Sequence, residues 1–222
     1  MSLPKLKQTF KMISLERYLN REKGKGFQSK LKYFSNYRKS KSFETGVITY
    51  GVGGNTFRAF VGFDKQPSII YRTWAERKFN ELTTGILELK IEDQAAFDVW
   101  HKKLFNSLSA HWYSEQGREL SLAHSYKLLD LFLKWVYQHK SCPEDLANSI
   151  EQFGHCALDS QVLKELNICF SFALPINNPT MGDIINQNTY DFCQNLIEYF
   201  THEFGGTKLA FDFYAWKGKT SE

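Results

Sequence analysis

Two predicted helical segments carry the residues best suited to covalent chemistry. The first, residues 121–137, places Lys127 and Lys134 among leucines, and the second, residues 155–166, contains Asp159. Lys127 and Lys134 are seven residues apart and therefore share one face of a helix. An amine on an apolar helix face, beside a carboxylate at a helix start, can form a covalent bond to a sugar carbon.

The surroundings predicted for these two groups favour that chemistry. A helix as apolar as residues 121–137 is expected to be largely buried, and a lysine held there loses solvation, which favours the neutral, nucleophilic amine. Asp159 stands at the predicted start of the next helix, where free backbone N–H groups favour an ionised carboxylate. That carboxylate could deprotonate the lysine or stabilise an oxocarbenium ion. In the alternative interpretation, Asp159 only caps its helix and Lys127 is a surface lysine.

The same two segments resemble the catalytic half of the helix-hairpin-helix DNA glycosylases, most closely the archaeal-type 8-oxoguanine DNA glycosylases. The run Lys127-Leu-Leu-Asp-Leu-Phe-Leu-Lys134 is similar to the helix that carries the family's nucleophilic lysine. Cys156-Ala-Leu-Asp159-Ser-Gln-Val162 is similar to the segment that carries its aspartate, with Ala157 in place of the usual proline. The spacing of 32 residues from Lys127 to Asp159 (159 − 127) suits the archaeal-type branch.

The resemblance covers residues 118–168 and implies a glycosylase acting on DNA, with or without lyase activity. The implied target is an oxidised or otherwise modified base, flipped out of the duplex because its glycosidic bond is unreachable in the stack. Lys127 would be the nucleophile, with Lys134 as the reserve, and Asp159 would assist. Aromatic side chains would stack on the flipped base, and the candidates are Trp112, Phe213 and Trp216. The role would be DNA repair or attack on modified foreign DNA, as in phage defence.

One departure from the family pattern favours a second function. The glycine-rich hairpin that normally precedes the lysine is missing, and residues 120–124 (Leu-Ser-Leu-Ala-His) stand in its place. The alternative is a non-catalytic nucleic-acid-binding or protein-interaction module of the same fold. The retained Lys127 and Asp159 favour an enzyme, while the absent hairpin favours the module.

Positive charge is concentrated at the start of the chain. Residues 1–42 hold 12 Lys or Arg against Glu16 and Glu22, a balance of +10, so the other 180 residues sum to −6 within the total of +4. Such asymmetry predicts a basic arm that binds a polyanion, here duplex DNA, although a solvated helix pair or a membrane-binding surface gives the same pattern. The predicted contacts to the DNA backbone are Lys23, Lys25, Lys30, Lys32, Arg38 and Lys39.

Hydrophobic periodicity predicts a mainly α-helical fold, a glycosylase-like helical bundle. We expect helices over residues 8–22, 27–38, 73–82, 93–113, 120–139, 143–153, 159–166 and 188–204, with 209–216 a short helix or strand. A small antiparallel hairpin or sheet is predicted near residues 46–72, with strands at 47–50, 57–63 and 68–71 around the glycines of 51–54. The expected domains are a basic arm, 1–42, and a body, 43–222, which could also be one continuous domain.

No pattern in the chain predicts a cofactor or a metal. The glycines lack a phosphate-loop signature, the six histidines lack ligand spacing, and His155 beside Cys156 is expected to bond backbone rather than a metal. The first 30 residues hold no apolar run typical of a signal peptide, and no 18-residue apolar run follows. With Cys142, Cys156, Cys169 and Cys193 expected to be reduced, the sequence favours a cytoplasmic protein without a membrane partner.

Overall fold

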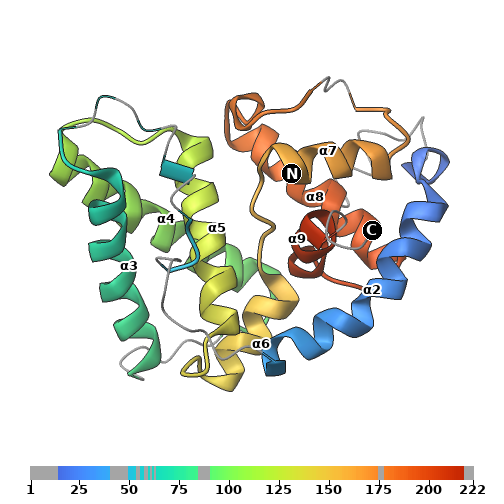
Figure 1. Cartoon of the computed structure of the whole chain (residues 1–222), viewed down its shortest axis with the longest axis horizontal. Helices are drawn as coiled ribbons and strands as arrows, with labels where there is room; N and C mark the ends of the chain where they lie inside the picture. The colour runs from blue at the N-terminus through green and yellow to red at the C-terminus, as the bar shows by residue number, and fades with distance from the viewer. Residues whose placement is uncertain are drawn as a thin grey trace. The chain divides into compact units, whose positions relative to one another are not determined.

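The structure is a computed structural model in which eight α-helices lie in the described residues (Figure 1). It describes residues 15–40, 50–53, 56–57, 60, 62, 64–84, 91–174 and 178–217, and the side chains of 35–40 and 217 are not included. The mainly α-helical class is therefore confirmed. No helix in these ranges is both long and apolar enough to cross a bilayer.

The chain divides into two compact units, and the predicted arm and body, residues 1–42 and 43–222, stay a prediction. Unit 1 comprises Met1–Asn36 and His155–Glu222, so that it is built from both ends of the chain. Unit 2 is the continuous stretch Tyr37–Gly154. The described part of the expected basic arm thus packs with the C-terminal helices of unit 1, because its aromatic side chains enter their core.

Unit 2 is a group of four helices. They are α3 (Pro67–Thr83), α4 (Gln94–Gln116), α5 (Leu122–Gln138) and α6 (Glu144–Phe153). Helix α4 packs against α3, α5 and α6, and α5 also packs against α6. The predicted helix over 93–113 is confirmed, and its apolar face is buried in this core.

In unit 2, helices α4 and α5 begin at residues whose side chains accept hydrogen bonds from free backbone N–H groups, and α4 ends at a glycine. Asp93 caps α4 by accepting a hydrogen bond of 2.7 Å from the backbone N–H of Ala96. Gly117 ends α4 in the left-handed conformation at φ 66°, which glycine adopts without strain. Ser121 caps α5, the helix that carries Lys127, by accepting from the backbone N–H of His124. These caps place the start of α5 within two residues of the predicted position.

Unit 1 contains four α-helices and two short 3₁₀ helices among its described residues. They are η1 (Leu15–Tyr18), α2 (Arg21–Ser40, of which residues to Asn36 belong to unit 1), α7 (Ser160–Cys169), η3 (Met181–Asp183), α8 (Gln187–Glu203) and α9 (Lys208–Lys217). Phe27 of α2 is completely buried against Phe200 of α8 and Tyr214 of α9, with ring centroids 5.6 and 5.5 Å apart. These aromatic contacts hold α2 in the unit.

The predicted break between helices 8–22 and 27–38 is wrong, because α2 runs unbroken from Arg21. Its two glycines lie inside the helix, where glycine costs about 1 kcal/mol relative to alanine. Gly24 has a packing reason: a Cβ atom built there would overlap the ring of Phe204. The glycine therefore lets α2 approach α8 closely and does not end the helix. Residues 8–14 of the first predicted helix lie outside the described residues.

The predicted small sheet near residues 46–72 is wrong for the residues that the structure describes. Residues 68–71, predicted as a strand, form the first turn of α3, which Pro67 opens. Residues 47–49, 54–55, 58–59, 61 and 63 lie outside the described residues. Tyr50 and Gly51 form a turn at positive φ, and the Tyr50 carbonyl accepts a hydrogen bond of 2.7 Å from the Tyr71 hydroxyl.

The packing of two aromatic side chains, Phe57 and Phe60, explains why their segment has a sequence pattern typical of a strand. Phe57 packs on Tyr71 of α3 at 5.8 Å, and Phe60 packs on Trp112 of α4 at 5.5 Å. Phe60 lies outside any regular element, and Phe57 lies in a single 3₁₀ turn. Here two aromatic residues of irregular or 3₁₀ backbone pack on helices, and a short aromatic-rich segment of this kind is difficult to distinguish from a strand by sequence pattern alone.

Candidate active site

Lys127 lies in the second turn of α5 and is half-buried. Its neighbours Leu128 and Leu129 are completely buried, whereas Lys134, seven residues further on, is half-buried like Lys127. The predicted helix and the shared face are therefore confirmed. Both lysines lie at the border between the apolar core and the surface.

Asp159 begins α7, as predicted. Its Oδ1 atom accepts hydrogen bonds of 2.9 Å from the backbone N–H groups of both Gln161 and Val162, and only 8% of the residue is exposed. The capping role, the alternative left open by the sequence, is therefore present. Two backbone donors and the positive end of the helix dipole favour the ionised carboxylate. A cap and a catalytic carboxylate are compatible, since the same bonds fix the position of the charge.

Lys127 belongs to unit 2 and Asp159 to unit 1. That they share one pocket stays a prediction. Two hollows on unit 2 alone have volumes of about 450 and 300 Å³, and Lys127 lines neither of them. The larger is lined by α3 residues, and the smaller lies between Ile69 and His111.

The three aromatic residues predicted to stack on a base differ in exposure. Trp112 is completely buried in unit 2 and contacts Phe60. Phe213 is 6% exposed and packs on Phe34 at 5.1 Å, inside unit 1. Trp216, near the end of α9, is 51% exposed. Trp216 is therefore the candidate with a ring accessible to a ligand, while the other two are core residues.

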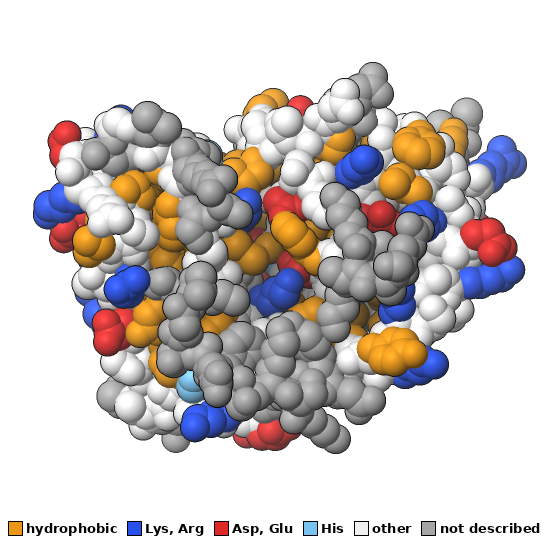
Figure 2. Space-filling view, viewed as in Figure 1, with side chains coloured by type: hydrophobic (Ala, Val, Ile, Leu, Met, Phe, Trp, Pro, Cys, Tyr) orange, Lys and Arg blue, Asp and Glu red, His pale blue; other side chains and the backbone are white. Residues whose placement is uncertain are grey.

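The described cations of α2 are engaged with acids or rings. Lys23 forms an ion pair of 2.9 Å with Glu165, and Lys25 forms one of 2.8 Å with Glu22. The Lys30 amine lies 5.5 Å from the ring centroid of Tyr214. Lys32 lies over Tyr33 at 4.9 Å. The side chains of Arg38 and Lys39 lie outside the described part. On the face drawn in Figure 2, the coloured Lys and Arg side chains are interspersed with Asp and Glu.

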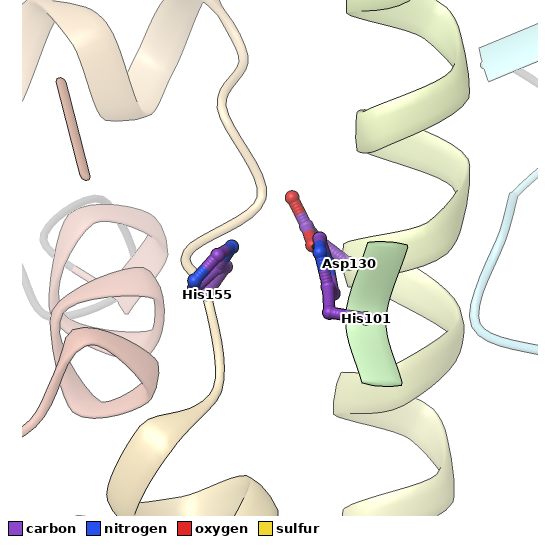
Figure 3. Close-up of side chains that lie close together, drawn as sticks. All are labelled: His101, Asp130 and His155. Atoms are coloured by element: carbon purple, nitrogen blue, oxygen red, sulfur yellow. The ribbon is translucent and has the colours of Figure 1, made fainter. Parts of the chain in front are cut away.

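A buried histidine–aspartate pair lies in unit 2, and the sequence reasoning missed it. Nε2 of His101 in α4 lies 2.7 Å from Oδ1 of Asp130 in α5, and the residues are 2% and 1% exposed. The labelled side chains of the two residues lie close together in Figure 3. The His101 ring stacks on Tyr126 at 5.7 Å with an interplanar angle of 5°, and on Phe97 at 5.9 Å. The signal was available, because each polar residue interrupts an apolar helix face.

His124 lies one turn before Lys127 and is electrostatically coupled to it. Its Nδ1 atom lies 2.6 Å from the Ser121 hydroxyl, and its ring packs on Phe60 at 4.6 Å. The Nε2 atom is buried and has no hydrogen-bond partner among the described residues. Burial lowers the pKa of His124, and the positive charge of Lys127 lowers it further. A neutral imidazole therefore accompanies the lysine near neutral pH.

The other residues considered as metal ligands are His155, which is hydrogen-bonded within unit 1, and the buried cysteines. Nδ1 of His155 lies 3.0 Å from the Tyr190 hydroxyl, and the predicted bond to backbone stays a prediction. All four cysteines are buried thiols. Burial raises the pKa of Cys169 and Cys193, which makes these two thiols poor ligands and poor nucleophiles.

Comparison with known proteins gave no match to a protein-family model, to a curated protein or to a solved structure.

Proposed function

We propose that this protein is a DNA glycosylase that removes an oxidised or otherwise modified base from duplex DNA, and that Lys127 is its nucleophile. The proposal rests on the resemblance of residues 118–168 to the helix-hairpin-helix glycosylases. The observation that supports it best is Asp159, a buried carboxylate whose Oδ1 is fixed by two backbone N–H groups at the start of α7. Lys127 is half-buried on α5, which is compatible with this role.

The chemistry needs no cofactor. The Asp159 carboxylate accepts a proton from the Lys127 ammonium group, and the amine formed in this way attacks C1′ of the deoxyribose while the C1′–N bond to the base breaks. The electron pair of that bond leaves with the base, which takes up the proton from Asp159, and a proton of the lysine nitrogen passes to the ring oxygen of the sugar. The sugar ring then opens to give a lysine–C1′ Schiff base. Loss of a proton from C2′ expels the 3′ phosphate by β-elimination, which constitutes the lyase step.

Borohydride trapping tests the proposal. The protein is incubated with a panel of duplex oligonucleotides that carry oxidised, alkylated or deaminated bases, and borohydride is added to reduce any Schiff base to a stable amine. We expect a covalent protein–DNA adduct on at least one duplex. Mass spectrometry of the digested adduct should place the deoxyribose remnant on Lys127.

Three lysine variants separate a specific nucleophile from adventitious trapping. Lys127→Ala should abolish the adduct, whereas Lys134→Ala should retain it, because the reserve lysine lies two turns away on the same face. Lys103→Ala, at an exposed position of α4, controls for general loss of surface charge. Failure of the wild-type protein to form an adduct on any duplex, with DNA binding intact, would instead favour the non-catalytic module.

A further inference from the structure

The segment that leads into Asp159 has no regular structure of its own. Residues 155–159 form neither helix nor strand, although Cys156, Ala157, Leu158 and Asp159 are all buried. Buried backbone N–H and C=O groups must find partners, since each unsatisfied one costs about 1–3 kcal/mol. At Cys156 and Ala157 those partners are side chains from helices α8 and α9.

Gln194 of α8 bonds both backbone groups of Cys156. The Cys156 N–H donates to Oε1 of Gln194 at 3.0 Å, and Nε2 of Gln194 donates to the Cys156 carbonyl at 2.7 Å. The glutamine is 4% exposed. Its amide thus pairs with the loop as a neighbouring β-strand would, and no side chain without both a donor and an acceptor can replace it.

Asp212 of α9 holds the next residue. Its Oδ2 atom accepts a hydrogen bond of 3.1 Å from the backbone N–H of Ala157, and the aspartate is 1% exposed. Beyond the loop, Nε2 of Gln161 donates to the carbonyl of Ala215 in α9 at 3.1 Å. The backbone is therefore held two residues before Asp159, and the Gln161 side chain connects the first turn of α7 to α9.

We infer that Gln194 and Asp212 are positioning residues that hold the Asp159 carboxylate in place for its role at Lys127, an inference that rests on the proposed function. Neither side chain contacts the reacting atoms. They act through the backbone of Cys156 and Ala157, which lies two to three residues from the carboxylate. A displacement of about 1 Å in a reacting group can cost about 100-fold in rate.

The test compares Gln194→Leu with a matched variant, Asn167→Leu. Asn167 is also a buried amide of unit 1, and its Oδ1 accepts the backbone N–H of Leu174 at 3.2 Å, at the opposite end of α7 from Asp159. Both variants should lower the thermal unfolding temperature. Only Gln194→Leu should lower the single-turnover trapping rate constant at saturating DNA, by about 10–100-fold, with the DNA dissociation constant unchanged.

Asp212 supplies a second variant pair that keeps the inference testable if Gln194→Leu does not fold. Asp212→Leu removes the acceptor for the Ala157 N–H and should slow trapping. Asp212→Asn keeps an acceptor oxygen and should restore most of the rate. An equal rate in Asp212→Leu and the wild-type protein overturns the inference for Asp212, as wild-type trapping by Gln194→Leu does for Gln194.

Amide hydrogen exchange gives a readout that is independent of activity. The N–H groups of Gln161 and Val162, which donate to Asp159, should exchange faster in Gln194→Leu and Asp212→Leu than in Asn167→Leu. Equal exchange in all three variants overturns the positioning role. If the wild-type protein forms no adduct, the glycosylase proposal fails, and the exchange comparison alone decides whether Gln194 and Asp212 position Asp159.

Discussion

Nε2 of His101 lies 2.7 Å from Oδ1 of Asp130, and both side chains are almost completely removed from solvent between α4 and α5. Asp130 follows Lys127 by one turn of the same helix. Removing one partner from such a pair is costly, since the other loses this hydrogen bond while it stays buried. This pair therefore ties the helix that carries the proposed nucleophile to the core of unit 2.

A double-mutant cycle measures that coupling. His101→Leu and Asp130→Leu should each lower the free energy of unfolding by about 1–3 kcal/mol, and the double variant should lose less than the sum of the two. Urea denaturation gives each value. The exposed Lys65–Glu115 ion pair of the same unit, at 2.7 Å, is the control and should show much weaker coupling, because solvent screens it. Additive losses at His101 and Asp130 would show that the two side chains do not interact.

Alanine substitutions at the two glycines of α2 should change the free energy of unfolding in opposite directions. Gly24→Ala should lower the free energy of unfolding by about 1–3 kcal/mol, because the new methyl group would overlap the buried ring of Phe204. Gly26→Ala should raise it by up to about 1 kcal/mol, because its Cβ would lie 3.7 Å from the Tyr214 hydroxyl, an ordinary contact. Urea denaturation compares them. Stabilisation by both substitutions would contradict the close packing of α2 on α8.

The pKa of His124 should report the charge of Lys127. Burial and then the lysine lower the pKa of His124, so NMR titration should give a value below 6.5, and Lys127→Met should raise it. His139 is the matched control, because burial and Lys140 lower its pKa in the same way. Lys140→Met should therefore raise the pKa of His139 and leave that of His124 unchanged. A response of His124 to both substitutions would contradict a local interaction with Lys127.

A depressed histidine pKa also predicts acid sensitivity. The unfolded chain binds a proton at His124 near pH 6.5, while the folded protein resists it until a lower pH. The stability that His124 contributes is therefore present above about pH 6.5 and is lost as the pH falls through the folded pKa. Unfolding free energies at pH 7.5 and 5.5 should differ less in His124→Phe than in the wild-type protein. An equal difference would assign the acid sensitivity to other groups.

Alkaline pH should weaken the fold through Cys193. Burial is the main cause that raises its pKa from 9.0 to about 12. The stability that the protonated thiol contributes is thus complete below about pH 9 and is lost as the pH rises toward 12, with a slope of order 1 kcal/mol per pH unit. Urea denaturation between pH 8 and 10.5 should show a smaller loss in Cys193→Ala. The same slope in both proteins would contradict a buried, protonated thiol.

Local chemistry made much of the helical fold predictable. Asp93, Ser121 and Asp159 are cap residues followed by apolar positions at helical spacing, and each one caps a helix in the structure. The sequence therefore located α4, α5 and α7, and with them the helical positions of Lys127 and Asp159. These signals are readable because capping and amphipathic spacing depend on residues only a few positions apart.

Tertiary packing decided the secondary structure of segments whose residue types are compatible with more than one conformation. Gly24 falls in the gap between two predicted helices, yet it lies within α2, where the ring of Phe204 occupies the space that a side chain would fill. Residues 68–71 have strand-like composition but become helical, since Pro67 opens α3 and Ile70 and Tyr71 are buried in its core. Such outcomes depend on partners that are distant along the chain, and local propensity cannot specify them.

The sequence by itself determined the helical class, the helix that carries Lys127 and the helix that begins at Asp159. These features depend on capping and spacing among near neighbours. Only the tertiary structure decided that His101 meets Asp130 and that Gln194 and Asp212 hold the segment before Asp159. The partners in these contacts lie 29 to 55 residues apart. Each buried polar group must find its complement wherever packing brings one. That complement is a property of the fold and not of the local sequence.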